Sequence, residues 1–350
     1  TASRALGITL TKRGKHLGED IPMCGVPVHA ADDYLQKLIR LGHRVAVCEQ
    51  TEDPEEARKR GSKSVVRRAV TRLVTPGTIT EDTLLDARRH NYLAALVRVR
   101  SEEELAIAWL DISTGDFCVT SLPADALPAE LARLEPGEIV LADTLLADPS
   151  VSRLLQELGI PPTPLPASRF DSSAAEHRLK NHFEVFTLDA FGSFTRAELA
   201  AAGALVDYVT LTQMGRAPVI SAPSRQAREK RMAIDQATRA NLELMRTTSG
   251  ERQGPLLDTI DMTATAPGGR LLAEWLASPL VHPESINGRL DAVGFLAGRR
   301  ELRRTLRDAL KATPDLGRAL ARITVGRGSP RDLAAIRDGL DAARTLALVL

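Results

Sequence analysis

The spacing of hydrophobic residues predicts a small mixed α/β unit at the start of the chain. Apolar side chains recur at helical spacing from Ala30 to Leu41, and Gly42 then suits the end of a helix. β-Branched residues indicate a strand from Arg44 to Cys48. Every second residue from Val66 to Val74 is a valine or an arginine, which is the alternation expected of a strand. We assign this unit to residues 1–87.

The pattern then changes to strands mixed with helices, which is typical of an α/β layer domain. Strands are predicted at Tyr92–Val99, Leu105–Ile112, Asp116–Thr120, Glu138–Leu141 and Pro161–Pro166, and helices at Ala124–Leu134, Ser150–Leu158 and Arg196–Leu211. Thr114 and Gly115 suit a hairpin bend between two of the strands. We assign this domain to residues 88–215.

Helical periodicity takes over from Arg225 onward, and residues 225–350 are predicted to form an all-helical domain. Prolines punctuate its helices, because proline is tolerated in the first turn of a helix but not in its interior; they are Pro279, Pro283, Pro314 and Pro330. Trp275 is expected to anchor the core, because three leucines share its helix face (Leu271, Leu272 and Leu276).

Composition adds few constraints. A chain of 350 residues with 43% hydrophobic and 26% charged residues fits two or three globular domains. No apolar run reaches the roughly 20 residues of a membrane span, and the opening residues do not resemble a secretory leader, so we expect a cytoplasmic protein. Cys24, Cys48 and Cys118 are odd in number and widely spaced, which argues against a disulfide framework and a zinc knuckle, and we expect buried thiols. We assign no metal site.

Charge is strongly sorted within the first unit. The formal net charge is only +1, yet the segment from Ala57 to Thr80 contains no Asp or Glu. It contains seven basic residues: Arg58, Lys59, Arg60, Lys63, Arg67, Arg68 and Arg72. Such a stretch, ending in the turn Thr75-Pro76-Gly77, predicts an edge that binds phosphates with an affinity that falls as salt rises. The alternative is an ordinary solvated face, which most charged stretches are.

Eight segments, in this order along the chain, resemble the MutS family of DNA mismatch repair proteins. They are LTKRG (Leu10–Gly14), IPMCGVPVHA (Ile21–Ala30), AVCEQ (Ala46–Gln50), LVTPGT (Leu73–Thr78), LDISTGDF (Leu110–Phe117), AIDQATRANLEL (Ala233–Leu244), TATAPGGRLLAEWLASPL (Thr263–Leu280) and PRDLAAIR (Pro330–Arg337). The resemblance covers nearly the whole chain. It implies a small mixed α/β DNA-contact domain, a connector with a ribonuclease-H-like α/β fold, and a helical core domain.

The resemblance also implies which residues contact DNA. Those that match family positions against the DNA backbone and minor groove are Lys12, Arg13, Arg72, Thr75 and Pro76, and Met23 matches a loop position beside them. These residue types suit the task, because basic side chains position the duplex, hydroxyl groups bond phosphate oxygens, and a small apolar side chain can exploit a weakened base step. The bland alternative for Met23 is a tightly packed turn, since Gly25 and Pro27 follow it.

The family recognises mispairs with a phenylalanine that is followed two residues later by a glutamate. No phenylalanine precedes Phe117, and the chain is expected to begin just downstream of that pair. Val28 also stands where an aromatic residue or histidine often precedes the family's histidine, here His29. We therefore expect these 350 residues alone to bind matched and mismatched duplexes almost equally.

Nucleotide chemistry is expected elsewhere in the full-length family protein. ATP and Mg²⁺ are bound there by a C-terminal domain that also makes the main contacts of the homodimer, and the connector docks a downstream repair partner. No segment here has the Gly-Lys-Ser/Thr signature of a phosphate-binding loop, and the nearest string, Gly61–Ser64, lacks the glycine before lysine. We therefore assign this chain no catalytic residue and no cofactor, and expect a nucleoid-associated DNA-binding protein that is not itself an enzyme.

Two alternatives remain open at this stage. Asp111 and Asp116 lie near a hairpin and could hold Mg²⁺ in a nuclease, although two carboxylates are a weak signal and Asp111 also suits a turn-capping role. The other alternative is a purely structural fragment that docks partners.

Overall fold

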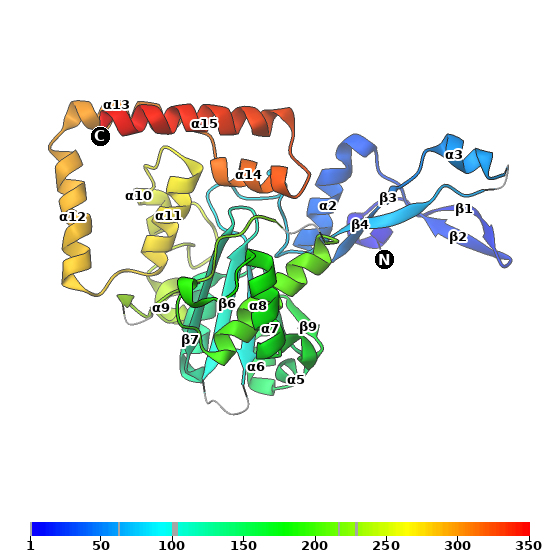
Figure 1. Ribbon diagram of the computed structural model, residues 1–350, viewed down its shortest axis with the longest axis horizontal. Coiled ribbons are helices and arrows are strands. Elements are labelled where there is room, and N and C mark those ends of the chain that lie inside the picture. The colour runs from blue at the N-terminus through cyan, green and yellow to red at the C-terminus, as the bar shows by residue number, and fades with distance from the viewer. Residues whose placement is uncertain (1, 62–63, 100–103, 216–217, 228–229) are drawn as a thin grey trace.

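The chain folds into an α/β body with an N-terminal extension on one side and a frame of helices on the other (Figure 1). This computed structural model describes residues 2–61, 64–99, 104–215, 218–227 and 230–350. Lys63 of the basic stretch lies outside the described residues. The architecture is the predicted combination of mixed α/β and all-helical parts.

The N-terminal extension is built from two small antiparallel ribbons and short helices. One ribbon pairs β1 (Thr11–His16) with β2 (Glu19–Met23), and the other pairs β3 (Val45–Gln50) with β4 (Arg68–Val74). Its helices are α1 (Ala2–Leu6), a 3₁₀ turn (Val28–Ala30), α2 (Ala31–Arg40) and α3 (Pro54–Lys59). The predicted helix and both predicted strands are confirmed. Gly42 follows α2 with φ +77°, a conformation in which glycine avoids the strain of a side chain.

A six-stranded sheet forms the centre of the α/β body. Its order is β10-β7-β6-β5-β8-β9; β6 runs antiparallel to both β5 and β7, whereas β8, β9 and β10 each pair in parallel. The strands are β5 (Tyr92–Arg98), β6 (Leu105–Asp111), β7 (Asp116–Leu122), β8 (Glu138–Ala142), β9 (Pro162–Leu165) and β10 (Ser224–Arg225). The five predicted strands are confirmed, because long apolar runs such as that of β6 are buried on both faces.

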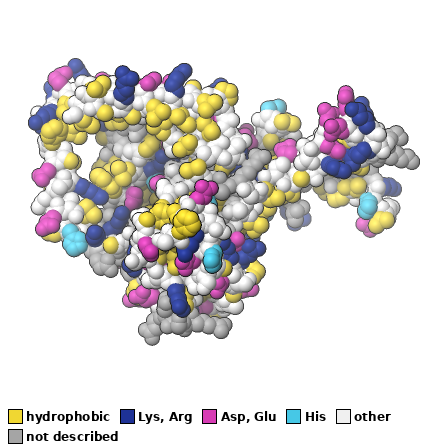
Figure 2. All heavy atoms as spheres, in the orientation of Figure 1, with side chains coloured by type: hydrophobic (Ala, Val, Ile, Leu, Met, Phe, Trp, Pro, Cys, Tyr) yellow, Lys and Arg dark blue, Asp and Glu magenta, His cyan; other side chains and the backbone are white. Residues whose placement is uncertain are grey.

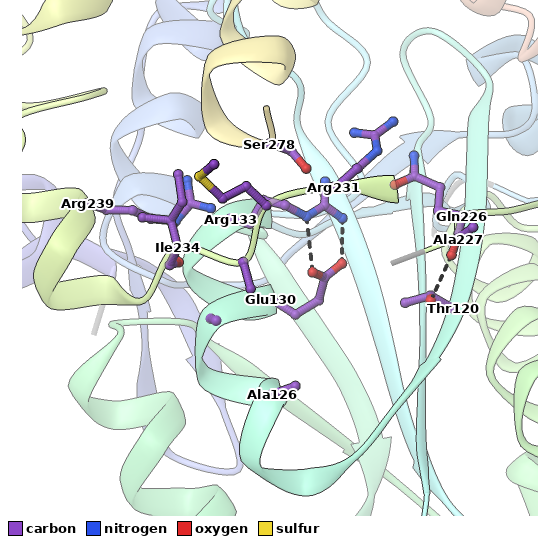
Figure 3. A pocket seen from close by; sticks show the side chains of 13 residues that line it. Thr120, Ala126, Glu130, Arg133, Gln226, Ala227, Arg231, Ile234, Arg239 and Ser278 are labelled. Carbon is purple, nitrogen blue, oxygen red and sulfur yellow. Dashed lines mark hydrogen bonds and ion pairs between the residues drawn. The ribbon is translucent and has the colours of Figure 1, made fainter. Parts of the chain in front are cut away.

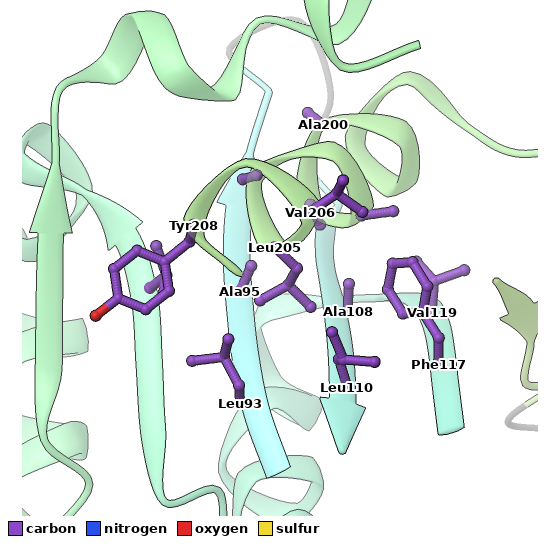
Figure 4. Packing of buried hydrophobic residues seen from close by; sticks show 14 of the residues in the cluster. Leu93, Ala95, Ala108, Leu110, Phe117, Val119, Ala200, Leu205, Val206 and Tyr208 are labelled. Atoms are coloured by element: carbon purple, nitrogen blue, oxygen red, sulfur yellow. The ribbon is translucent and has the colours of Figure 1, made fainter. Parts of the chain in front are cut away.

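Helices cover both faces of this sheet. One face carries α7 (Ser172–Phe183) and α8 (Arg196–Thr212), and Figure 4 shows Leu205 and Val206 of α8 packed over Leu93 and Ala108. The other face carries a 3₁₀ turn (Ala124–Ala126), α4 (Leu127–Leu134), α5 (Asp143–Leu146) and α6 (Pro149–Glu157). Further 3₁₀ turns lie at Ala167–Phe170 and Asp189–Phe191. The three predicted helices are confirmed, whereas α7 was not foreseen.

The helical part runs from α9 to α15. Its members are α9 (Gln236–Asn241), α10 (Leu256–Ile260), α11 (Ala266–Ala277), α12 (Pro283–Ala297), α13 (Arg300–Lys311), α14 (Leu316–Thr324) and α15 (Pro330–Val349). Pro283 and Pro330 stand at helix starts, as predicted. Helices α12, α13 and α15 form the outer frame in Figure 1. No helix in the described ranges is long and apolar enough to cross a bilayer.

Two sequence predictions about the core are wrong. Trp275 is 39% exposed, with the Arg289 guanidinium 3.7 Å from its ring centroid. The buried stripe of α11 consists instead of small residues and one arginine (Gly269, Arg270, Ala273 and Ala277), which turns the leucine and tryptophan stripe outward. Cys48 is likewise exposed rather than buried, because β3 belongs to a narrow ribbon with little to cover it.

Candidate nucleic-acid interface

The β1/β2 hairpin lies on the N-terminal extension, away from the sheet of the α/β body, and every one of its strand residues is exposed (Figure 1). Lys12 is 70% exposed in its side chain and forms an ion pair with Asp20, with 2.8 Å between Nζ and Oδ2. Such an exposed pair contributes little to stability, so Lys12 can exchange it for a phosphate. Arg13 lies where the pairing register shifts between Lys12 and Lys15, and it is also exposed. The basic side chains of this hairpin are therefore not needed to stabilise the fold, and they can move to contact a ligand.

Met23 is the last residue of β2, at the end of the same hairpin that lies away from its turn. It pairs with Thr11, whose hydroxyl donates to the Met23 carbonyl oxygen at 2.9 Å, and its own side chain remains exposed. Residues directly opposite each other in an antiparallel ribbon share a face, and neighbours along a strand do not. Met23 and Lys12 therefore lie close together but on opposite faces of the ribbon.

The predicted basic edge is less positive in three dimensions than in the sequence. Arg68 is exposed at the start of β4, whereas Arg60 and Arg67 both reach Glu52, which precedes α3. The Arg67 backbone N–H also donates to Glu52 at 2.5 Å. The segment 57–80 contains no carboxylate of its own, but the fold places the Glu52 side chain against two of its arginines. What remains exposed is a cluster around α3 and the start of β4, in which Figure 2 shows acidic and basic side chains together.

Arg72 turns inward, unlike the arginines before it. Its side chain is 17% exposed and forms an ion pair with Glu81, near Arg327 of the helical part. Burial, and then the repulsion of Arg327, lowers the pKa of the Arg72 guanidinium. As placed here, Arg72 ties β4 to the segment that follows it and has little surface to offer a phosphate.

The Thr75-Pro76-Gly77 turn is a joint between the extension and the α/β body. Thr75 is completely buried, its hydroxyl donates to Glu138 of β8, and the Gly77 N–H donates to the same carboxylate oxygen at 3.1 Å. The Pro76 carbonyl accepts from the Asn91 side chain at 2.9 Å. Direct DNA contact by Thr75 does not fit this burial, and we correct that prediction to a structural role.

Glu138 is the centre of this joint. It is 1% exposed and also accepts from Thr163 and, at 2.7 Å, from the Tyr208 hydroxyl. Burial, followed by the negative charge of Glu138, raises the pKa of Tyr208, so this hydroxyl remains a donor. A Cβ added at Gly77 would lie 2.7 Å from the Leu93 side chain and 2.9 Å from Cβ of Glu138, so only glycine fits. Sequence reasoning missed this role, although a glutamate within the apolar strand EIVL was the available signal.

Arginines of the helical part hold the linker between the extension and the α/β body. Arg318 is buried and donates to the backbone carbonyls of Asp86, at 3.0 Å, and Arg89, at 2.7 Å. Arg270 donates to the carbonyl of Ala87 at 2.8 Å. These contacts fix the path of the chain that leads to the hairpin, and sequence analysis did not find them because carbonyl partners leave no residue signature.

Asp111 has the turn-capping role that was set against the nuclease alternative. It is buried and accepts from the N–H and hydroxyl of Ser113 at 2.9 and 2.6 Å, while His90 Nδ1 lies 2.9 Å from Oδ2. Burial alone would raise the pKa of Asp111, but the hydrogen bonds from His90 and Ser113 outweigh it and hold the pKa below its ordinary value. Within the described ranges, no three His, Cys, Asp or Glu side chains converge to hold a metal.

Three family models match consecutive parts of the chain. MutS domain I matches residues 1–83, MutS domain II matches 91–221 and MutS domain III matches 237–350. Curated relatives named DNA mismatch repair protein MutS match almost the whole chain. The protein from Nitrobacter winogradskyi is 58% identical over 99% of this chain and 39% of its own length, and that from Rhizobium meliloti is 56% identical over 100% and 38%. The chain thus spans about two fifths of the length of these relatives.

Proposed function

The chain belongs to the MutS family of DNA mismatch repair proteins, and from this premise we propose that its N-terminal extension contacts the backbone of double-stranded DNA. The observation that supports this proposal is the fully exposed β1/β2 hairpin. The side chains of Lys12 and Arg13 both lie in solvent, and the ion pair of Lys12 with Asp20 is itself exposed. Cationic side chains of this kind give sequence-independent affinity by releasing counterions from phosphates.

We divide the proposed contacts by position. Lys12 and Arg13 bind phosphates directly, with Arg68 as a further contact, and Met23 supplies an apolar contact on the face of the hairpin opposite Lys12. Arg72, Thr75 and Pro76 act behind this surface by setting the orientation of the extension. The proposed units are a DNA-contact domain (1–87), a connector (88–215) and a helical core domain (225–350).

The whole protein is proposed to recognise mismatched duplexes as a homodimer and to couple recognition to ATP and Mg²⁺, with the nucleotide chemistry in another domain. The connector is proposed to dock a downstream repair partner. We further propose that the protein works in the cytoplasm at the nucleoid.

The test is duplex binding over a series of salt concentrations, followed by fluorescence anisotropy. The double variant Lys12→Ala/Arg13→Ala should bind more weakly and show a slope of log affinity against log salt that is shallower by about 1 for each lost phosphate contact. Arg304→Ala/Lys311→Ala is the matched control, because it removes the same two charges from exposed ion pairs on α13. An equal change in both variants would remove the hairpin from the interface.

A further inference from the structure

A cleft of about 790 Å³ lies where the linker, the α/β body and the start of the helical part meet. Its walls include linker residues 84–92, the end of α4, the loop 245–252 and one side of α11. This volume is in the range of small-molecule sites and is too small for a duplex. The cleft is separate from the hairpin surface.

Arginines outnumber acidic residues among the described residues that line the cleft. The arginines are Arg40, Arg89, Arg133, Arg239, Arg246, Arg252 and Arg270, and the acidic residues are Asp86, Glu135 and Glu274. Some of these charges already have partners outside the lining set. Arg133 pairs with Glu130, Arg270 with Asp315, and Glu274 with Arg231. Five guanidinium groups are then left facing two carboxylates, so the cleft carries a surplus of positive charge.

The two remaining carboxylates are shared or exposed. Glu135 contacts both Arg89 and Arg246, the latter at 3.7 Å, and Asp86 contacts Arg252 at 2.6 Å. Arg239 donates from Nε to the Ile234 carbonyl oxygen at 3.0 Å, and within the described ranges no carboxylate lies at ion-pair distance from it. Burial and then the repulsion of neighbouring arginines lower the pKa of both Arg239 and Arg252. An anion placed among these groups would relieve that repulsion.

A smaller cavity of about 50 Å³ adjoins the cleft and shares Arg133 and Arg239 with it. Figure 3 shows the paired Glu130 and Arg133 side chains in this cavity, together with Ser278. The Ser278 hydroxyl is buried and has no hydrogen-bond partner among the described residues. A buried hydroxyl is rarely left without a partner, so this one indicates a polar occupant such as water or an oxyanion.

We propose that the cleft binds a compact anion with two or more phosphate groups, held by Arg239, Arg246 and Arg252. Guanidinium groups bind phosphate oxygens through paired hydrogen bonds, and phosphates place more charge in a small volume than carboxylates do. The ligands come from α9 and from the loop before α10, opposite the linker. A bound anion therefore links the helical part to the segment that carries the DNA-contact domain.

Isothermal titration calorimetry with inorganic tripolyphosphate tests this proposal on the chain as it stands. We expect one binding site. The variant Arg246→Ala/Arg252→Ala should bind tripolyphosphate more weakly by about tenfold or more, because it loses two guanidinium groups that bind phosphate. Both side chains are partly exposed, so their loss leaves the fold intact. Arg304→Ala/Arg337→Ala is the charge-matched control on α13 and α15, and its affinity should be unchanged. The affinity of the variant Arg246→Lys/Arg252→Lys for tripolyphosphate should lie between that of the alanine variant and that of the parent chain.

Two further probes define the class of ligand. Citrate carries about the same charge as pyrophosphate but has no phosphate group, and it should bind more weakly than pyrophosphate. A 5′-phosphorylated dinucleotide compared with pyrophosphate distinguishes a nucleic-acid end from a free phosphate anion, and either order fits the proposal. Absence of tripolyphosphate binding, an equal loss in the control variant, or citrate binding as tightly as pyrophosphate would overturn it.

Discussion

Replacing Thr75 by valine separates a structural role for this residue from a role in DNA binding. Valine has nearly the same shape but lacks the hydroxyl that donates to Glu138 and lies 2.9 Å from the hydroxyl of Thr78. Because Thr75 is completely buried, water cannot replace the lost donor. The buried Glu138 carboxylate would then keep three of its four hydrogen-bond donors, those of Gly77, Thr163 and Tyr208.

The expected cost is about 2 kcal/mol, since hydrogen bonds to charged groups contribute roughly 1.5–3 kcal/mol and an unsatisfied buried group costs a similar amount. This corresponds to a shift of more than tenfold in the folding equilibrium. DNA affinity and its salt dependence should remain close to those of the parent chain.

The assay uses the fluorescence of Trp109, which is buried in the core beneath α4, during unfolding in urea. The chain has two tryptophans, so the parent chain and each variant carry Trp275→Phe, which leaves Trp109 as the only tryptophan. Thr144→Val, at an exposed position of α5, is the matched control and should cost far less. Unchanged stability together with weaker DNA binding in Thr75→Val would refute the structural role of Thr75 and favour the predicted phosphate contact.

Three more predictions follow from buried contacts. Gly77→Ala should destabilise the α/β body by about 1–3 kcal/mol, measured by the same urea transition, because its Cβ would overlap Leu93 and Glu138; a neutral effect would show that the turn can move freely. Arg318→Ala should speed amide hydrogen exchange in residues 86–89, because it removes the donors to two linker carbonyls; unchanged exchange would mean that other contacts hold the linker. The pKa of Asp111 is lowered in the folded state, so its contribution to stability is present above the unfolded value near 3.8 and is lost as pH falls through the folded value; Asp111→Asn should therefore lose stability at neutral pH and approach the parent chain in acid, and a constant difference across pH would contradict this.

Hydrophobic spacing was sufficient to predict most elements, because burial imposes its period directly on the sequence. Five of the six strands of the sheet and the helix before Gly42 are examples. Helix α7 was missed because its buried residues are few, Ala175 and Leu179 among polar neighbours. Trp275 was misplaced because α11 has two apolar stripes, and only tertiary packing shows that the stripe of small residues is the buried one.

The candidate site was predicted less well, because charge and hydrogen bonding depend on residues far away in the sequence. The segment 57–80 has no carboxylate, but Glu52 and Glu81 flank it and neutralise part of its charge. Thr75 suited a phosphate contact by type, yet its partner Glu138 lies 63 positions further along the chain. The hairpin residues Lys12 and Arg13 remain candidates because they came from the family resemblance and are exposed.

Hydrogen exchange of the chain with and without duplex DNA tests the central claim most directly, because it locates the contact along the backbone. The account predicts slower exchange in residues 11–23 on adding duplex, and then around Arg68. It predicts no change at residues 75–80, all of which except Pro76 are already buried. Protection confined to Thr75–Thr80 or to the helical part, with the hairpin unchanged, would contradict it.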